Sequence, residues 1–68
     1  MEELTEFAKG ILFAAAIVQA TSRTPVIAAD ILREAGLTHA NCAELDDYDK
    51  ENLRIVNKER GINLQNLD

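Results

Sequence analysis

Cysteine and histidine are scarce in this sequence, which contains one of each, Cys42 and His39. A lone cysteine forms no intramolecular disulfide, so a disulfide-rich scaffold is excluded, and an unpaired thiol is typical of a reducing, cytoplasmic compartment. A structural zinc site needs four ligands at close spacing, and His39, Cys42 and Asp46 have no second cysteine or histidine to join them. A Cys–His catalytic pair also needs an orienting group. We therefore expect no metal, no cofactor and no enzymatic activity, and we expect Cys42 to be a small core residue.

Positive charge and long apolar runs are also lacking. The chain has 7 Lys and Arg against 12 Asp and Glu, for a net charge of −5, whereas binding to a phosphate backbone depends on basic side chains. The apolar run 11–18 is far shorter than the roughly 20 residues that cross a bilayer. The preceding segment 1–6 is acidic, whereas an export signal begins with basic residues. We therefore expect a cytoplasmic protein that has no membrane segment and for which nucleic acid is an unfavoured partner.

What is present predicts one all-α domain over residues 1–68, built as a compact three-helix orthogonal or bundle-like arrangement. The predicted helices cover Glu2–Thr21, Pro25–Ala35 and a third range that begins at Asp46 or Asp47 and ends at Gly61. Residues 39–43 are expected to form a short turn or one additional short helical turn, with Thr38 as its cap. The last seven residues, 62–68, are too short for a helix, but their three apolar side chains predict that they dock onto the domain.

Two local signals define the second helix. Thr24 is a favourable N-cap residue, and Pro25 follows at the first helical position, where its missing N–H group costs nothing. Gly36 is suited to the left-handed residue after the last turn, and Leu37 can make the apolar contact that accompanies it.

The first predicted helix has two apolar sides. One stripe faces the core of the same chain and comprises Leu4, Phe7, Ala8, Ile11, Ala15 and Val18. A helix that is apolar on both sides must be buried on both sides, and a chain of 68 residues has little with which to cover the second one. The sequence therefore predicts a homodimer. The predicted interface residues are Gly10, Phe13, Ala14, Ala16, Ile17 and Ala20.

The third predicted helix carries one inward stripe, with Leu53 at its margin. Its members are Leu45, Tyr48, Asn52, Ile55 and Val56. Five acidic residues gather around the start of the same helix: Glu44, Asp46, Asp47, Asp49 and Glu51. They form a surface for a basic partner in one interpretation. In the other they complement the positive end of the helix dipole, as Arg54, Lys58 and Arg60 complement the negative end.

The segment 32–38 resembles the end of a helix and the turn of a helix-turn-helix unit, with Gly36 as the turn glycine. A recognition helix after this turn would carry acidic residues where base and phosphate contacts need basic or amide side chains. We therefore expect a small intracellular interaction or regulatory protein that self-associates through its first helix. Two alternatives remain open at this point, a DNA-binding regulator with a degenerate helix-turn-helix unit and an acidic nucleic-acid mimic that inhibits a basic partner.

Overall fold

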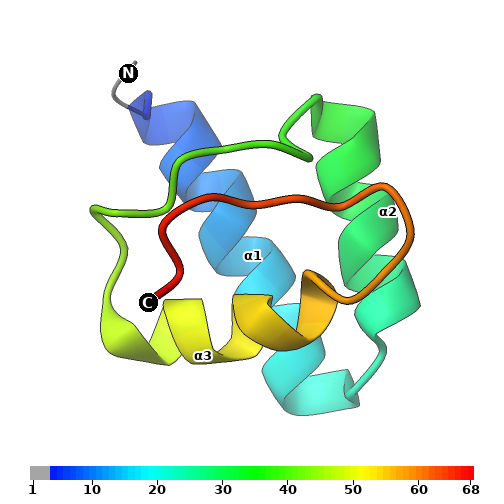
Figure 1. The fold of residues 1–68 in the computed structure, drawn as a ribbon. Coiled ribbons are helices and arrows are strands. Elements are labelled where there is room, and N and C mark those ends of the chain that lie inside the picture. Colours follow the sequence, from blue (N-terminus) through cyan, green and yellow to red (C-terminus); the bar gives the residue numbers. More distant parts are fainter. Residues whose placement is uncertain (1–3) are drawn as a thin grey trace.

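The computed structural model describes residues 4–68, which fold into three helices, α1 (Glu6–Ser22), α2 (Pro25–Ala35) and α3 (Asp47–Val56) (Figure 1). The described part of the chain contains no strand, so the predicted all-α, three-helix architecture is confirmed. Helix α1 packs against both other helices, whereas α2 and α3 share only a small contact. The domain is compact, with extents of 29 × 22 × 19 Å.

Helix α1 begins at a threonine cap. The Thr5 backbone is extended, and its Oγ1 atom accepts a hydrogen bond of 3.0 Å from the backbone N–H of Ala8. Such a bond satisfies one of the donors that the first turn leaves free, and for this reason the helix starts at Glu6. The predicted start at Glu2 lies outside the described residues, and the predicted end at Thr21 is one residue short of the observed Ser22.

The predicted bounds of α2 are confirmed. Pro25 occupies the first turn, Gly36 has a positive φ of 72°, and the Leu37 N–H donates to the Leu32 carbonyl over 2.9 Å. Together these features close the helix in the manner expected of a glycine after the last turn. Thr24 occupies the N-cap position, but its hydroxyl makes no capping bond and is buried without a partner in the described structure.

Helix α3 begins as predicted and ends earlier than predicted. The Asp46 carboxylate accepts a hydrogen bond of 2.9 Å from the Asp49 N–H and caps the first turn. The helix stops at Val56 and not at Gly61, because the Asn57 side-chain carbonyl accepts a hydrogen bond of 2.7 Å from the Leu64 N–H. Turns then lead to Gly61, whose φ of 80° reverses the chain toward the last segment.

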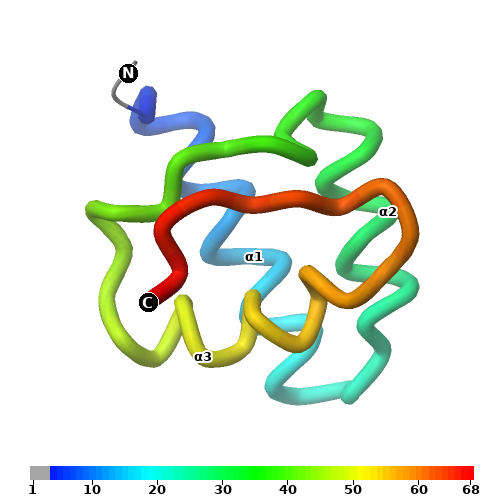
Figure 2. The backbone as a smooth tube through the Cα atoms, viewed as in Figure 1, coloured from blue at the N-terminus to red at the C-terminus, as the bar shows by residue number. Residues whose placement is uncertain are grey.

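The C-terminal segment, residues 62–68, runs beside residues 38–42 and closes the fold (Figures 1 and 2). The N–H groups of Asn63 and Gln65 donate to the carbonyls of Thr38 and Ala40 over 2.8 and 2.9 Å, and the Cys42 N–H donates to Gln65 over 2.8 Å. The predicted docking of this segment is therefore confirmed. The helix considered for residues 39–43 does not form, and the structure has only turns at His39 and Ala43, because Ala40 and Cys42 pair through their backbone groups with a segment distant in the sequence.

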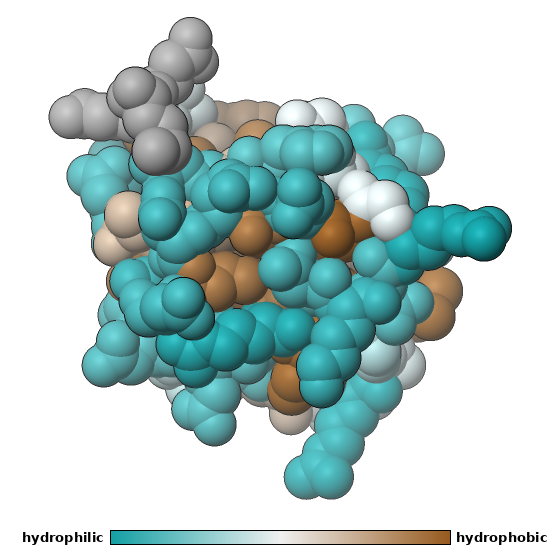
Figure 3. Space-filling model, viewed as in Figure 1, coloured by the Kyte–Doolittle hydropathy of each residue, from teal (hydrophilic) through white to brown (hydrophobic). Residues whose placement is uncertain are grey.

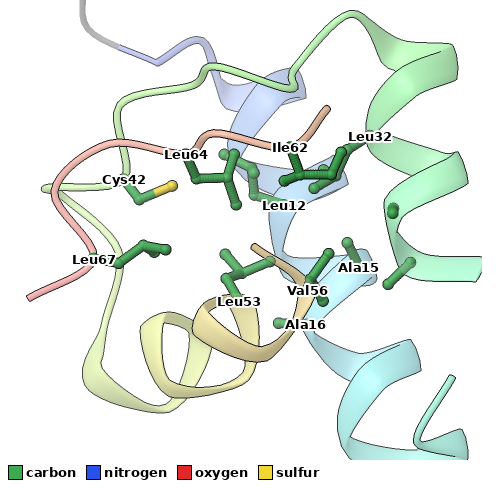
Figure 4. Packing of buried hydrophobic residues seen from close by; sticks show 12 residues of the cluster. Leu12, Ala15, Ala16, Leu32, Cys42, Leu53, Val56, Ile62, Leu64 and Leu67 are labelled. Carbon is green, nitrogen blue, oxygen red and sulfur yellow. The ribbon is translucent and has the colours of Figure 1, made fainter. Parts of the chain in front are cut away.

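The core forms where α1, α2, α3 and the C-terminal segment meet (Figure 4). Its members are Leu12, Ala15, Ala16, Ala28, Ala29, Leu32, Cys42, Leu53, Val56, Ile62, Leu64 and Leu67. Leu53 and Val56 are completely buried, whereas Tyr48 and Ile55 are exposed, so the inward stripe predicted for the third helix is wrong at these two positions. The contacts to α1 and to the C-terminal segment rotate the inward side of α3 toward Leu53.

Candidate interaction surface

The side of α1 that faces away from the core is apolar. Gly10, Phe13, Ala14 and Ile17 are exposed, and their spacing of i, i+3, i+4 and i+7 places them on one strip of the helix. Phe13 is 49% exposed and Ile17 is 37% exposed. We call these four residues the α1 outer face. They are four of the six residues that the sequence predicts for a dimer interface.

The other two predicted interface residues lie elsewhere. Ala16 is completely buried in the core, so its assignment to the interface is wrong. A residue at this position has no surface to offer a partner, because Leu12 and Ala16 lie one turn apart on the side that faces the core. Ala20 is half-buried and borders a groove between α1 and α3.

Phe7 was predicted to face the core, but it is 72% exposed and this assignment is wrong. Phe7 precedes Gly10 by three residues and therefore extends the α1 outer face toward the N-terminal end of the helix. Two further exposed apolar residues, Val26 and Ile27, lie in the first turn of α2. The sequence pattern did not identify them, because α2 presents apolar residues on more than its buried side.

A groove lies on each side of α1. The groove between α1 and α2 has a volume of about 460 Å³ and is mainly apolar, with two acidic residues among those that line it: Ile11, Ile27, Asp30, Ile31, Glu34 and Ala35. The groove between α1 and α3 has a volume of about 450 Å³ and a mixed lining of Gln19, Ala20, Arg23, Tyr48, Glu51, Asn52 and Ile55. The α1 outer face is thus a ridge between two hollows.

The opposite side of the molecule differs in character. Figure 3 shows the face that carries α3 and the C-terminal segment, and this face is mostly hydrophilic, with hydrophobic atoms visible mainly in its crevices. The C-terminal segment covers the core on this side, since Ile62, Leu64 and Leu67 point inward (Figure 4).

The acidic residues near the start of α3 divide into two groups. Glu44, Asp46, Asp47 and Glu51 are exposed, whereas Asp49 is only 5% exposed, so its assignment to an acidic partner surface is wrong. Asp49 turns inward because it lies one turn before Leu53 on the buried side of the helix. Burial raises the pKa of the Asp49 carboxyl, and the neighbouring Asp46 raises it further. Asp46 serves as the N-cap and Asp47 lies in the first turn, as helix electrostatics favours.

Asp49 leads to a prediction about pH. The pKa of the Asp49 carboxyl is higher in the folded chain than in the unfolded chain. Between these two pKa values the folded state binds a proton that the unfolded state has released. The free energy of unfolding therefore falls as the pH rises through the raised pKa. We expect Asp49→Asn to be more stable than the wild type near neutral pH, on the order of 1 kcal/mol, since it removes a buried charge with an unpartnered oxygen. This advantage should shrink on acidification below the ordinary value of 3.8. Urea denaturation of the wild type and Asp49→Asn, from neutral pH to below 3.8, measures this difference in the free energy of unfolding.

The matched control for this measurement is Asp47→Asn, two residues away on the same turn but exposed. This variant loses a favourable interaction with the helix dipole, so its stability should fall by about 0.3–1 kcal/mol. A lower stability of Asp49→Asn near neutral pH would contradict the prediction and show that the dipole outweighs the burial of the charge.

The segment after α2 does not form the second half of a helix-turn-helix unit. Residues 37–46 contain no helix, because residues 38–42 pair with the C-terminal segment. Cys42 is completely buried, and burial raises the pKa of its thiol to about 11, so the thiol is protonated at neutral pH. His39 is exposed, with Nδ1 3.0 Å from the Thr38 hydroxyl oxygen. Across the described residues, no three His, Cys, Asp or Glu side chains come together as a metal site.

The α1 outer face and the two grooves beside it form the candidate interaction surface. None of the helices in residues 4–68 combines the length and apolar character that crossing a membrane requires. No protein family model matches the chain, and the comparisons with curated proteins and with solved structures give no match either.

Proposed function

We propose that this chain is a small protein-interaction module that forms a homodimer through the α1 outer face. The observation that carries the proposal is the continuous apolar strip of Gly10, Phe13, Ala14 and Ile17 in the middle of the longest helix. The surface helix of a monomer normally presents polar residues to water on its outer side. Here the only polar residues on that side stand near the two ends of the helix, at Glu6 and Thr21.

Gly10 supports close approach by another chain. Apart from its chain neighbours and the backbone of its own helix, a methyl group added at Gly10 would meet no atom of the described residues within 4 Å, and the residue does not have a positive φ. Nothing in residues 4–68 therefore requires glycine at this position, although glycine inside a helix costs roughly 0.5–1 kcal/mol relative to alanine. The absence of a side chain at Gly10 would allow the helix of a second subunit to pack closely over this position.

The size of a stable interface indicates which other residues take part. A standard interface buries about 800 Å² on each partner, which is about a fifth of the 4306 Å² surface of this chain. Four side chains on one helix, of which Gly10 and Ala14 are small, do not cover that area. We propose that the exposed apolar residues beside the α1 outer face, namely Phe7, Val26 and Ile27, complete the contact.

Sedimentation equilibrium tests the proposal. We expect the wild type to sediment at about 15 kDa, twice the 7.5 kDa of one chain, and Phe13→Asp to sediment as a folded monomer at the same concentration. Loss of a central aromatic contact typically costs at least 2 kcal/mol, so the dissociation constant should rise by roughly 30-fold or more.

The matched control is Asn63→Asp, which adds the same charge at an exposed position of the C-terminal segment on the opposite side of the molecule. This variant should remain dimeric, because its new charge is remote from the α1 outer face. A wild type that sediments as a 7.5 kDa species at about 100 µM would overturn the proposal.

A further inference from the structure

We infer that the second copy binds antiparallel to the first, with a twofold axis that passes between Phe13 and Ala14. This inference rests on the proposed function and adds the orientation of the partner. In the antiparallel arrangement Gly10 lies opposite Ile17 of the partner subunit, and Phe13 lies opposite Ala14 of the partner subunit. Both pairs share the same midpoint in the sequence, between residues 13 and 14. One twofold axis therefore relates the two subunits and produces each pair twice, which gives four contacts.

The sizes of the side chains favour this orientation. Each pair places a large side chain against a small one, Ile17 over Gly10 and Phe13 over Ala14. Close helix packing requires that side chains of one helix fit into the gaps of the other. A parallel dimer would instead place each residue against its own copy. Phe13 would then meet Phe13, while Gly10 would face Gly10 and leave a gap.

The charges at the ends of α1 favour the same orientation. Glu6 stands at the N-terminal end with a side chain that is 95% exposed and 3.8 Å from Lys9. Arg23 follows the C-terminal end, and within residues 4–68 no carboxylate lies within 4.0 Å of its guanidinium. An antiparallel partner brings its Glu6 to the level of Thr21, about 3 Å along the axis from Arg23. A parallel partner would place Glu6 beside Glu6 and Arg23 beside Arg23.

The remaining exposed apolar residues also come together in this arrangement. Phe7 lies on the side of α1 that carries Ile11, which is the side of α2. Under the twofold axis, Phe7 reaches the level of Ala20 on the other subunit. The first turn of α2 lies near this level, because only Arg23 and Thr24 separate it from the end of α1 (Figure 1). Phe7 of each subunit thus covers the exposed Val26 and Ile27 of the other subunit.

Disulfide formation between cysteines introduced at two positions of α1 tests the orientation. We propose to prepare Gly10→Cys and Ile17→Cys, give one variant a size tag, mix the two proteins and oxidise them near neutral pH. In the antiparallel dimer, position 10 of one subunit faces position 17 of the other, and their two Cβ atoms are close enough for a disulfide bond. Two copies of position 10 are about 10 Å apart along the axis, as are two copies of position 17. Cys42 is buried with a pKa of about 11, so the wild type is the unreactive control.

We expect at least tenfold more cross-linked dimer in the mixture than with either variant alone. Efficient cross-linking of each variant alone would show a parallel dimer and overturn the inference, while the proposed self-association would stand. Dimers that sediment at about 15 kDa but never cross-link would also overturn the orientation. Monomeric wild type in sedimentation would overturn the proposed function itself, so the two failures are distinguishable.

Charge reversal provides a second measurement that does not alter the α1 outer face. In an antiparallel dimer, Arg23→Glu brings like charges together and should weaken association by about 2–5-fold at low salt, and Glu6→Arg in addition should restore it. In a parallel dimer, Arg23→Glu only exchanges one like-charged pair for another. Unchanged or tighter association of Arg23→Glu would therefore contradict the antiparallel arrangement.

Discussion

Replacement of Ile62, Leu64 and Leu67 by serine should abolish the cooperative unfolding of this chain. All three side chains are buried, although they belong to a segment without helix or strand. Burial of one such side chain stabilises a protein by about 1.5–3 kcal/mol, so the three together contribute roughly 5–9 kcal/mol as an upper estimate. A domain of this length has a total stability of only about 3–10 kcal/mol. The loss is therefore comparable with the whole stability of the fold.

The same substitutions would also expose the core on the side that the C-terminal segment covers. Leu64 packs in the same cluster as Leu12 and Leu53, which are completely buried (Figure 4). Water that reaches these residues would weaken the contacts between α1 and α3 as well. We expect a loss of the sigmoidal urea transition together with a strong reduction of the helical circular dichroism signal.

The control uses exposed positions of the same segment. Asn63 and Gln65 point to solvent and bind the neighbouring segment through their backbone groups. Their replacement by serine keeps the backbone pairing and should change the free energy of unfolding by less than about 0.5 kcal/mol. A cooperative transition in the triple serine variant would show that the three helices fold without the C-terminal segment.

Ala16→Asp should unfold the chain, whereas Ala14→Asp should leave it folded. The two positions are two residues apart on α1 and carry the same side chain, but Ala16 is completely buried and Ala14 is exposed. A carboxylate forced into an apolar core without a partner costs several kcal/mol. At position 14 the same charge meets water within the subunit and acts only on the proposed dimer.

Circular dichroism and sedimentation separate the two outcomes. We expect Ala16→Asp to lose its helical signal at 25 °C and Ala14→Asp to keep it while sedimenting as a monomer. A folded, monomeric Ala16→Asp variant would show that α1 is rotated relative to the structure and that Ala16 belongs to an interface.

Local signals in the sequence were sufficient for the helices themselves. The bounds of α2 follow from Pro25 and Gly36, although the Thr24 hydroxyl makes no capping bond, and the start of α3 follows from the Asp46 cap. These features act within one turn of helix, where hydrogen bonds and backbone preferences involve only neighbouring residues. They are therefore readable without knowledge of the fold.

The inward sides of the helices were harder to predict from the sequence. Helix α1 is apolar on two sides. The buried residues Ala8 and Ala15 belong to the predicted stripe, but the buried residues Leu12, Ala16 and Gln19 lie to one side of it. The reason is that α2 and α3 contact α1 from different directions and together with the C-terminal segment determine the buried side. For this reason Phe7 is exposed although it was predicted to face the core, and Ala16 is buried although it was predicted to face a partner. The prediction that α1 has an uncovered apolar side agrees with the exposed Phe13 and Ile17.

The amino-acid sequence alone determined that this chain is helical and that it has three helices in the observed order. It also determined that the first helix has more apolar surface than a small subunit covers. These properties depend on composition and short spacings. Only the tertiary structure decided which side of α1 is left uncovered, that α3 stops at Val56, and that residues 38–42 form no helix. Each of these depends on partners distant in the sequence, such as the bond from Leu64 to Asn57 and the pairing of Gln65 with Ala40 and Cys42. Such partners come within reach only when the chain has folded.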